Sequence, residues 1–191
     1  MNKIHGGNFA IGSAVRNTAR GLLVTLVAFM ATGMASAQAD SNDPNLLKFK
    51  GGIGVIPVTG VAANGAVNLN VVRGVNPGVP WRIADLQAAI TPDGHIKVAG
   101  RGLLLASTNG LGTNAGQSVH ATLFCGPAAR PTASNSTLPG VALAADGDFV
   151  IDDFLSPPPP VPCDSPVLLI RNVGGVWFAA GIPNLSGVNQ K

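Results

Sequence analysis

Short stretches of alternating apolar and polar residues recur along this chain from residue 46 onward. In one of them, Val67, Leu69 and Val71 alternate with asparagines; in another, residues 118–125, every second residue is apolar. Alternation with a period of two is typical of a β-strand that buries one face. The pattern predicts eight or nine short strands, at residues 46–58, 66–73, 81–90, 96–105, 118–125, 141–143, 149–154, 167–171 and 176–182.

Turn-forming residues separate these stretches. Thr91-Pro92-Asp93-Gly94 lies between two apolar runs, and Asp146-Gly147 lies between two others. Proline presets φ and glycine accepts a positive φ, so each motif predicts a β-hairpin. Residues 107–117 and 130–137 are expected to form loops, and the four prolines at 157–160 are expected to be extended because proline lacks an N–H donor.

Composition favours an all-β fold. The chain has 25 Gly and 15 Pro, which divide it into short segments, and it contains no Glu, a common helix-forming residue. We predict an antiparallel β-sandwich of the immunoglobulin-like or jelly-roll type with one disulfide. A small β-barrel is the alternative. Neither tryptophan lies between the two cysteines, so the Cys…Trp…Cys order of true immunoglobulin domains is absent.

The first 37 residues have the pattern of a secretory signal peptide. Basic residues precede a short apolar run at 22–31, and Ala35-Ser36-Ala37 follows as a cleavage motif. Cleavage is expected after Ala37 or after Ala39. We therefore predict a cleaved leader at 1–37, a mobile lead-in at 38–45, a single β domain at 46–191, and a secreted or periplasmic location. No later run reaches the ~20 apolar residues of a membrane span, so none is expected in the mature chain.

Charge argues against a nucleic-acid partner. Three of the 12 Lys and Arg residues but none of the nine Asp residues lie in the leader, so the rest of the chain carries nine of each and has no formal net charge. Phosphate recognition needs clustered Lys and Arg, whereas these are scattered singly.

The chain has only two cysteines, Cys125 and Cys163. Two cysteines in an exported chain normally pair, and here there is no Cys-x-x-Cys motif that would suggest redox activity. We predict a structural Cys125–Cys163 disulfide, with Cys125 pointing into the core.

Four acids between residues 146 and 153 form the sharpest candidate for a metal site. Asp146, Asp148 and Asp152 are possible calcium ligands, because calcium binds several oxygens that lie close together. The spacing does not match the twelve-residue calcium loop, so a polar turn is the competing interpretation. His95 and His120 are too few for a zinc or copper site and are expected at the surface.

Exposed aromatic rings are the usual platforms for sugars. Trp81 and Trp177 are the two candidates, and burial in the core is the alternative for both. Tyrosine is absent, which weakens the case for an aromatic binding surface.

No catalytic motif is present: there is no Gly-x-Ser-x-Gly, no Ser-x-x-Lys and no phosphate-binding loop. We therefore expect an exported, non-catalytic protein without a cofactor, with a binding or structural role in the cell envelope or extracellular space. Its partner is unknown, and we expect an envelope or extracellular protein or a glycan. A glycan- or calcium-binding module is one alternative, and a hydrolase whose site is assembled in space is another.

Overall fold

The computed structural model describes residues 47–184; the predicted leader and lead-in lie outside these residues. Thirteen β-strands and no helix occur in the described part of the chain. The all-β prediction is confirmed. The strands are β1 Leu47–Gly54, β2 Val58–Val61, β3 Val67–Leu69, β4 Trp81–Arg82, β5 Asp85–Ile90, β6 His95–Arg101, β7 Leu104–Leu105, β8 Ser118–Cys125, β9 Thr132–Asn135, β10 Val141–Ala142, β11 Phe149–Phe154, β12 Val167–Asn172 and β13 Trp177–Pro183.

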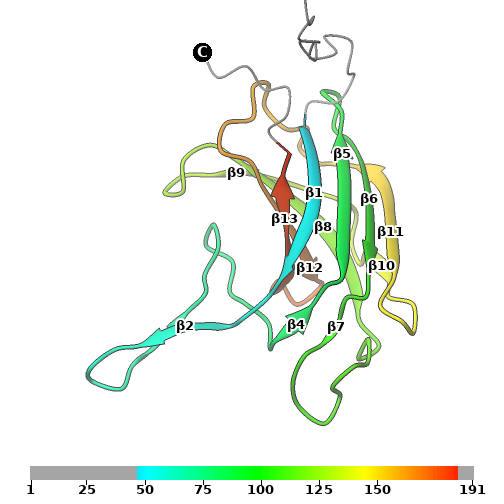
Figure 1. Ribbon diagram of the computed structural model, residues 1–191. Coiled ribbons are helices and arrows are strands. Elements are labelled where there is room, and N and C mark those ends of the chain that lie inside the picture. The colour runs from blue at the N-terminus through cyan, green and yellow to red at the C-terminus, as the bar shows by residue number, and fades with distance from the viewer. Residues whose placement is uncertain (1–46, 185–191) are drawn as a thin grey trace, which may run out of the picture. The chain divides into compact units, whose positions relative to one another are not determined.

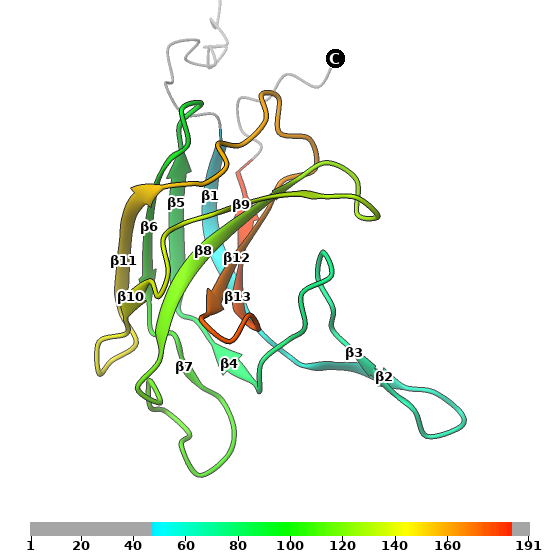
Figure 2. The same cartoon turned by 180° about the vertical axis from the view of Figure 1, so that it is seen from behind.

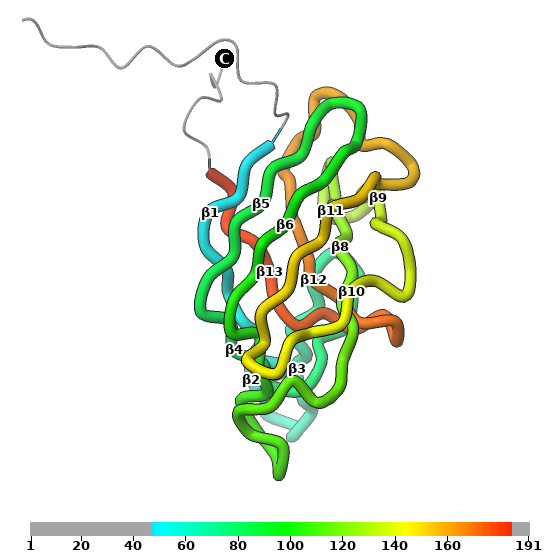
Figure 3. The backbone as a smooth tube through the Cα atoms, turned by 90° about the vertical axis from the view of Figure 1, so that its right-hand side faces the viewer, coloured from blue at the N-terminus to red at the C-terminus, as the bar shows by residue number. Residues whose placement is uncertain are grey.

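One antiparallel sheet contains most of these strands, in the order β10-β8-β12-β13-β1-β5-β6-β11, and β9 pairs with β8. The sheet curves back on itself, so that β5, β6 and β11 lie in front of β8, β12 and β13 in Figure 3. Its two ends come together in two places. Asn135 and Ser156 form an isolated antiparallel bridge, and a turn joins Ala144 to Asp148. This nearly closed sheet fits the small β-barrel that the sequence left as an alternative.

The core fills the space that the curved sheet encloses. Alternate residues of β5, β6 and β11 point inward, as the period of two predicted. The fully buried side chains include Leu86, Ile90, Ile96, Val98, Leu123, Leu168 and Ile170, contributed by strands from both halves of the sheet. The Cys125–Cys163 disulfide is confirmed, with a Cα–Cα distance of 4.9 Å, and both cysteines are buried. It ties the end of β8 to the segment that leads into β12.

The two predicted hairpins differ in outcome. The Pro92-Asp93-Gly94 turn joins β5 to β6, with Gly94 at φ 91°, as expected. The Asp146-Gly147 turn also forms, with Gly147 at φ 84°, but β10 pairs with β8 while β11 pairs with β6. The turn therefore links the two ends of the barrel instead of forming a hairpin ladder.

Three other segments depart from the predicted elements. The predicted strand at 81–90 is interrupted, giving β4 and β5, and β4 pairs with β7 in a separate two-stranded sheet. The predicted loop at 130–137 contains β9, whose small polar residues gave no periodic signal. The predicted half-buried strand at 66–73 contains β3, all of whose residues are exposed.

β2 and β3 form a separate hairpin that leads away from the barrel (Figures 1 and 2). We call residues 56–71 the arm. Its two strands pair only with each other, in an antiparallel register that places Val58 opposite Leu69 and Val61 opposite Val67. The alternation that predicted a buried face is present in the arm, but no other part of the described chain covers that face.

Candidate functional site

The carboxylates predicted to bind calcium do not converge. Asp146 accepts a hydrogen bond from the Asp148 backbone N–H at 3.1 Å, which stabilises the turn. Asp148 accepts one from the Gly102 N–H at 2.9 Å. Asp152 lies further along β11, on an exposed face of the sheet. No group of three acids, histidines or cysteines with metal-binding geometry occurs within residues 47–184. The structure places these acids in the turn and in an ion-pair network, and calcium binding stays a prediction.

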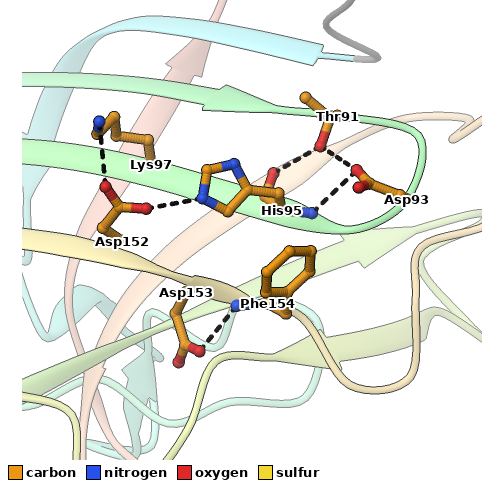
Figure 4. A network of polar contacts seen from close by, with 7 residues as sticks. All are labelled: Thr91, Asp93, His95, Lys97, Asp152, Asp153 and Phe154. Carbon is orange, nitrogen blue, oxygen red and sulfur yellow. Dashed lines mark hydrogen bonds and ion pairs between the residues drawn. The ribbon is translucent and has the colours of Figure 1, made fainter.

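That network joins β6 to β11 (Figure 4). The Asp152 carboxylate lies 2.7 Å from Nε2 of His95 and 3.1 Å from Nζ of Lys97. Lys97 is the cross-strand neighbour of Asp152, which explains their contact. Hydrogen bonding to Lys97, followed by that to His95, lowers the pKa of Asp152. All three side chains are well exposed, and surface ion pairs of this kind contribute little to stability.

The same network bears on the hydrolase hypothesis. A His–Asp pair can activate a neighbouring hydroxyl group. Among the described residues, no serine or threonine hydroxyl makes a hydrogen bond to the His95 ring, which packs against the ring of Phe154 with centroids 5.0 Å apart. The nearby Thr91 hydroxyl contacts the carboxylate of Asp93 and the backbone carbonyl of His95. These contacts fix the β5–β6 turn.

Neither tryptophan offers an open platform. Each exposes only 3% of its surface. Trp81 stacks on Phe178, with ring centroids 4.2 Å apart and planes 18° from parallel. Trp177 donates from Nε1 to the backbone carbonyl of Asn70 at 3.1 Å. Both indoles are therefore buried, as the alternative interpretation expected. The Trp81 ring packs in the barrel, and the Trp177 ring anchors the base of the arm.

The arm presents a set of uncovered apolar side chains. Between 40 and 70% of each of these side chains is exposed: Ile56, Val58, Val61, Val67, Leu69 and Val71. The four of them within the paired strands, Val58, Val61, Val67 and Leu69, share one face of the two-stranded ribbon. No Asp, Glu, Lys, Arg or His occurs between Gly51 and Val72. The run of uncharged residues was visible in the sequence, but it does not by itself distinguish an exposed ribbon from a core strand.

Several hydrogen bonds fix the base of the arm on the barrel. Arg73 donates from Nη1 to the carbonyl of Gly126 at 2.8 Å and from Nη2 to that of Ser165 at 2.6 Å. Asn70 joins the two strands of the arm through its side-chain amide, which donates to the carbonyl of Ile56 at 3.0 Å. Together with the Trp177 contact, these bonds attach the arm firmly where it leaves the barrel.

His120 is buried, in contrast to its predicted surface position, with 4% of its surface exposed. It lines a cavity of about 350 Å³ together with Arg171, Asn135 and Ser156. The cavity brings together residues that are far apart in the sequence, which is why periodicity and motifs did not reveal it. Burial lowers the pKa of His120, and the neighbouring positive charge of Arg171 lowers it further.

Comparisons of the chain with protein-family models, with curated proteins and with solved structures give no match. The described residues contain no helix that is long and apolar enough to cross a membrane.

Proposed function

We propose that the protein is an exported, non-catalytic structural domain that assembles with a second copy of itself through the arm. The observation that carries this proposal is the exposure of an apolar face on a ribbon that has only two strands. Export is supported by the Cys125–Cys163 disulfide, since disulfides persist in oxidising compartments.

Physical chemistry favours a covered arm over a free one. An isolated two-stranded hairpin is marginally stable in water, and stability normally requires a third strand or a packed face. Fully burying a valine or leucine side chain contributes roughly 1.5–3 kcal/mol. The six apolar side chains of the arm therefore represent a large driving force for association once a matching surface is available.

The arm has few of the features that usually keep edge strands apart. Natural proteins protect exposed edges with lysines, prolines or bulges. In the paired segments of the arm, Val58–Val61 and Val67–Leu69, there is neither a charge nor a proline. The register shift between Val58 and Gly60 is the one irregularity within this pair of strands. The outer edges of both strands are thus suitable for pairing.

A second copy is the partner that best suits these edges. Pairing about a two-fold axis brings the same edge of each arm together, so apolar residues meet apolar residues and no like charges face each other. The resulting four-stranded sheet would satisfy backbone groups that are unpaired in one copy. A charged partner would lose hydration against this surface without gaining an ion pair.

The test is the oligomeric state of the purified protein across concentration. We expect sedimentation velocity to show a concentration-dependent dimer or higher assembly. Val61→Asp combined with Leu69→Asp should shift the protein to a monomer, because it places like charges on the pairing surface. Val150→Asp is the matched control, since Val150 is 59% exposed on the barrel, away from the arm. A wild type that stays monomeric at millimolar concentration would contradict the proposal.

A further inference from the structure

The cavity beside His120 lies on the outer side of the sheet. His120 of β8 and Arg171 of β12 are cross-strand neighbours, so their side chains project from the same face. The adjacent pair, Ala121 and Ile170, points into the barrel core. Residues 135–138, the end of β11 and the turn at 173–175 complete the wall of the cavity. Its volume of about 350 Å³ is near the lower end for ligand sites, which suits a small molecule.

Arg171 supplies this cavity with a positive charge that no acid neutralises. No carboxylate of the described residues lies within ion-pair distance of Arg171. Its Nε and Nη2 donate to the carbonyl of Gly175, at 3.2 and 2.7 Å, and its Nη1 donates to the Thr122 hydroxyl at 3.3 Å. A guanidinium has five N–H donors, so one remains on each terminal nitrogen. Two such donors match the two oxygens of a carboxylate.

The other polar side chains that line the cavity add no second positive charge to that of Arg171. The lowered pKa of His120 keeps its imidazole neutral at neutral pH. Its Nδ1 is buried and has no hydrogen-bond partner in the described chain. Asn135 and Ser156 contribute an amide and a hydroxyl to the lining. A single fixed charge suits a monocarboxylate better than a phosphate, which carries nearly two charges and three oxygens at neutral pH.

The lining of the cavity also has an apolar part. It consists of Leu138, Phe154 and Val173, each of which exposes more than half of its surface. An apolar group of a ligand would cover part of this surface and be stabilised by burial. The geometry points to a binding site for a small organic monocarboxylate, whose carboxylate pairs with Arg171 and whose apolar body contacts Phe154. This site is separate from the arm and does not depend on self-association.

Benzoate is a suitable probe, and benzamide is its neutral counterpart of nearly the same shape. The experiment is a nuclear magnetic resonance titration of the ¹⁵N-labelled protein with each compound. We expect saturable shifts with benzoate, concentrated at the backbone amides of residues 120, 135–138 and 171–175. Benzamide should bind at least about tenfold more weakly, because it lacks the charge that strengthens hydrogen bonds to a guanidinium.

Arg171 also holds the turn before β13, so its replacement alone would not separate binding from folding. Val173 gives a cleaner variant, because it is 65% exposed at the mouth of the cavity. Val173→Asp introduces a negative charge that repels the carboxylate of benzoate, so it should weaken benzoate binding by about threefold or more. Val173→Asn introduces a side chain of the same size and polarity as aspartate but without the charge, so the ratio of the two variants' affinities for benzoate measures the effect of the charge alone.

Three results would overturn the inference. One is equal binding of benzoate and benzamide, which would make the cavity an apolar pocket without carboxylate recognition. Another is the absence of saturable benzoate shifts at the lining residues. Equal benzoate affinity of the Val173→Asp and Val173→Asn variants would likewise contradict the placement of the carboxylate beside Arg171.

Discussion

Replacing Gly100 by alanine would place a methyl group where the ring of Phe149 now lies. Gly100 of β6 and Phe149 of β11 are cross-strand neighbours, and the ring covers the glycine. A Cβ at residue 100 would approach ring carbons Cε1 and Cζ of Phe149 well inside the 3.0 Å that real Cβ atoms respect. Phe149 is 95% buried, so its ring has little space into which to move.

The expected cost follows from this clash. Overpacking a well-filled core typically destabilises a protein by about 1–3 kcal/mol, and we expect a value in this range for Gly100→Ala. Phe149→Ala should cost about 3–5 kcal/mol, because it removes a buried ring. In the Phe149→Ala background the added methyl group meets no ring, so Gly100→Ala should then be nearly neutral. The two substitutions should therefore couple by about 1–3 kcal/mol.

Urea unfolding followed by circular dichroism, applied to the wild type, both single variants and the double variant, measures this coupling. Gly60→Ala in the arm is the matched control, because no atom lies within 4 Å of a Cβ built there. Its free energy of unfolding should stay within about 1 kcal/mol of the wild type. Additive effects of the Gly100 and Phe149 substitutions would refute the proposed packing between β6 and β11.

Three further predictions concern the disulfide, the base of the arm and the buried histidine. Replacing Cys125 and Cys163 by alanine should lower stability by about 4 kcal/mol in the chain-entropy model for a separation of 38 residues, and a loss below about 1 kcal/mol in urea unfolding would contradict it. Arg73→Ala removes two hydrogen bonds to barrel carbonyls and should speed amide exchange at the base of the arm; unchanged exchange would show that the anchor is not needed. Burial lowers the pKa of His120 below its usual value of 6.5, so the unfolded chain binds more protons and stability should fall as the pH drops below about 6.5. His120→Gln should flatten that slope in thermal unfolding, and an unaltered slope would assign it to other groups.

Local features of the chain were predictable from the sequence. The β5–β6 turn follows from Pro92-Asp93-Gly94, because the positive φ of Gly94 is required there whatever the rest of the fold does. The disulfide follows from the number of cysteines, and the inward face of β8 follows from its alternation. Each of these inferences depends on neighbouring residues or on chain composition alone.

Features that depend on what covers a face were not predictable. Val67, Leu69 and Val71 alternate in the same way as Val119 and Ala121, yet the first set is exposed and the second is fully buried. Alternation identifies the residues that share one side of a strand, but it carries no information about the segment packed on that side. The exposure of the arm and the burial of His120 both follow from tertiary contacts.

The partners of the two strands that flank residues 146 and 147 also depend on tertiary structure. The Asp-Gly motif specified a turn, and the turn is present with the Ala144 N–H donating to the Asp148 carbonyl at 2.9 Å. A regular hairpin would pair the flanking strands with each other. Here the flanking strands pair with β8 and β6, because the turn lies where the two ends of one sheet meet. The motif determined the local backbone, and the curvature of the whole sheet determined the partners.

The incomplete closure of the barrel also explains the position of the Arg171 cavity. A sheet that closed by regular hydrogen bonding along its full length would have no irregular edge. Here the Asn135–Ser156 bridge joins the two sides, and both residues line the cavity. A carboxylate held beside Arg171 would contact both ends of the sheet at once and would bind the closed barrel alone. By mass action such a ligand at a hundred times its dissociation constant would stabilise the fold by about 2.7 kcal/mol, so occupancy of the cavity and closure of the barrel are expected to be coupled.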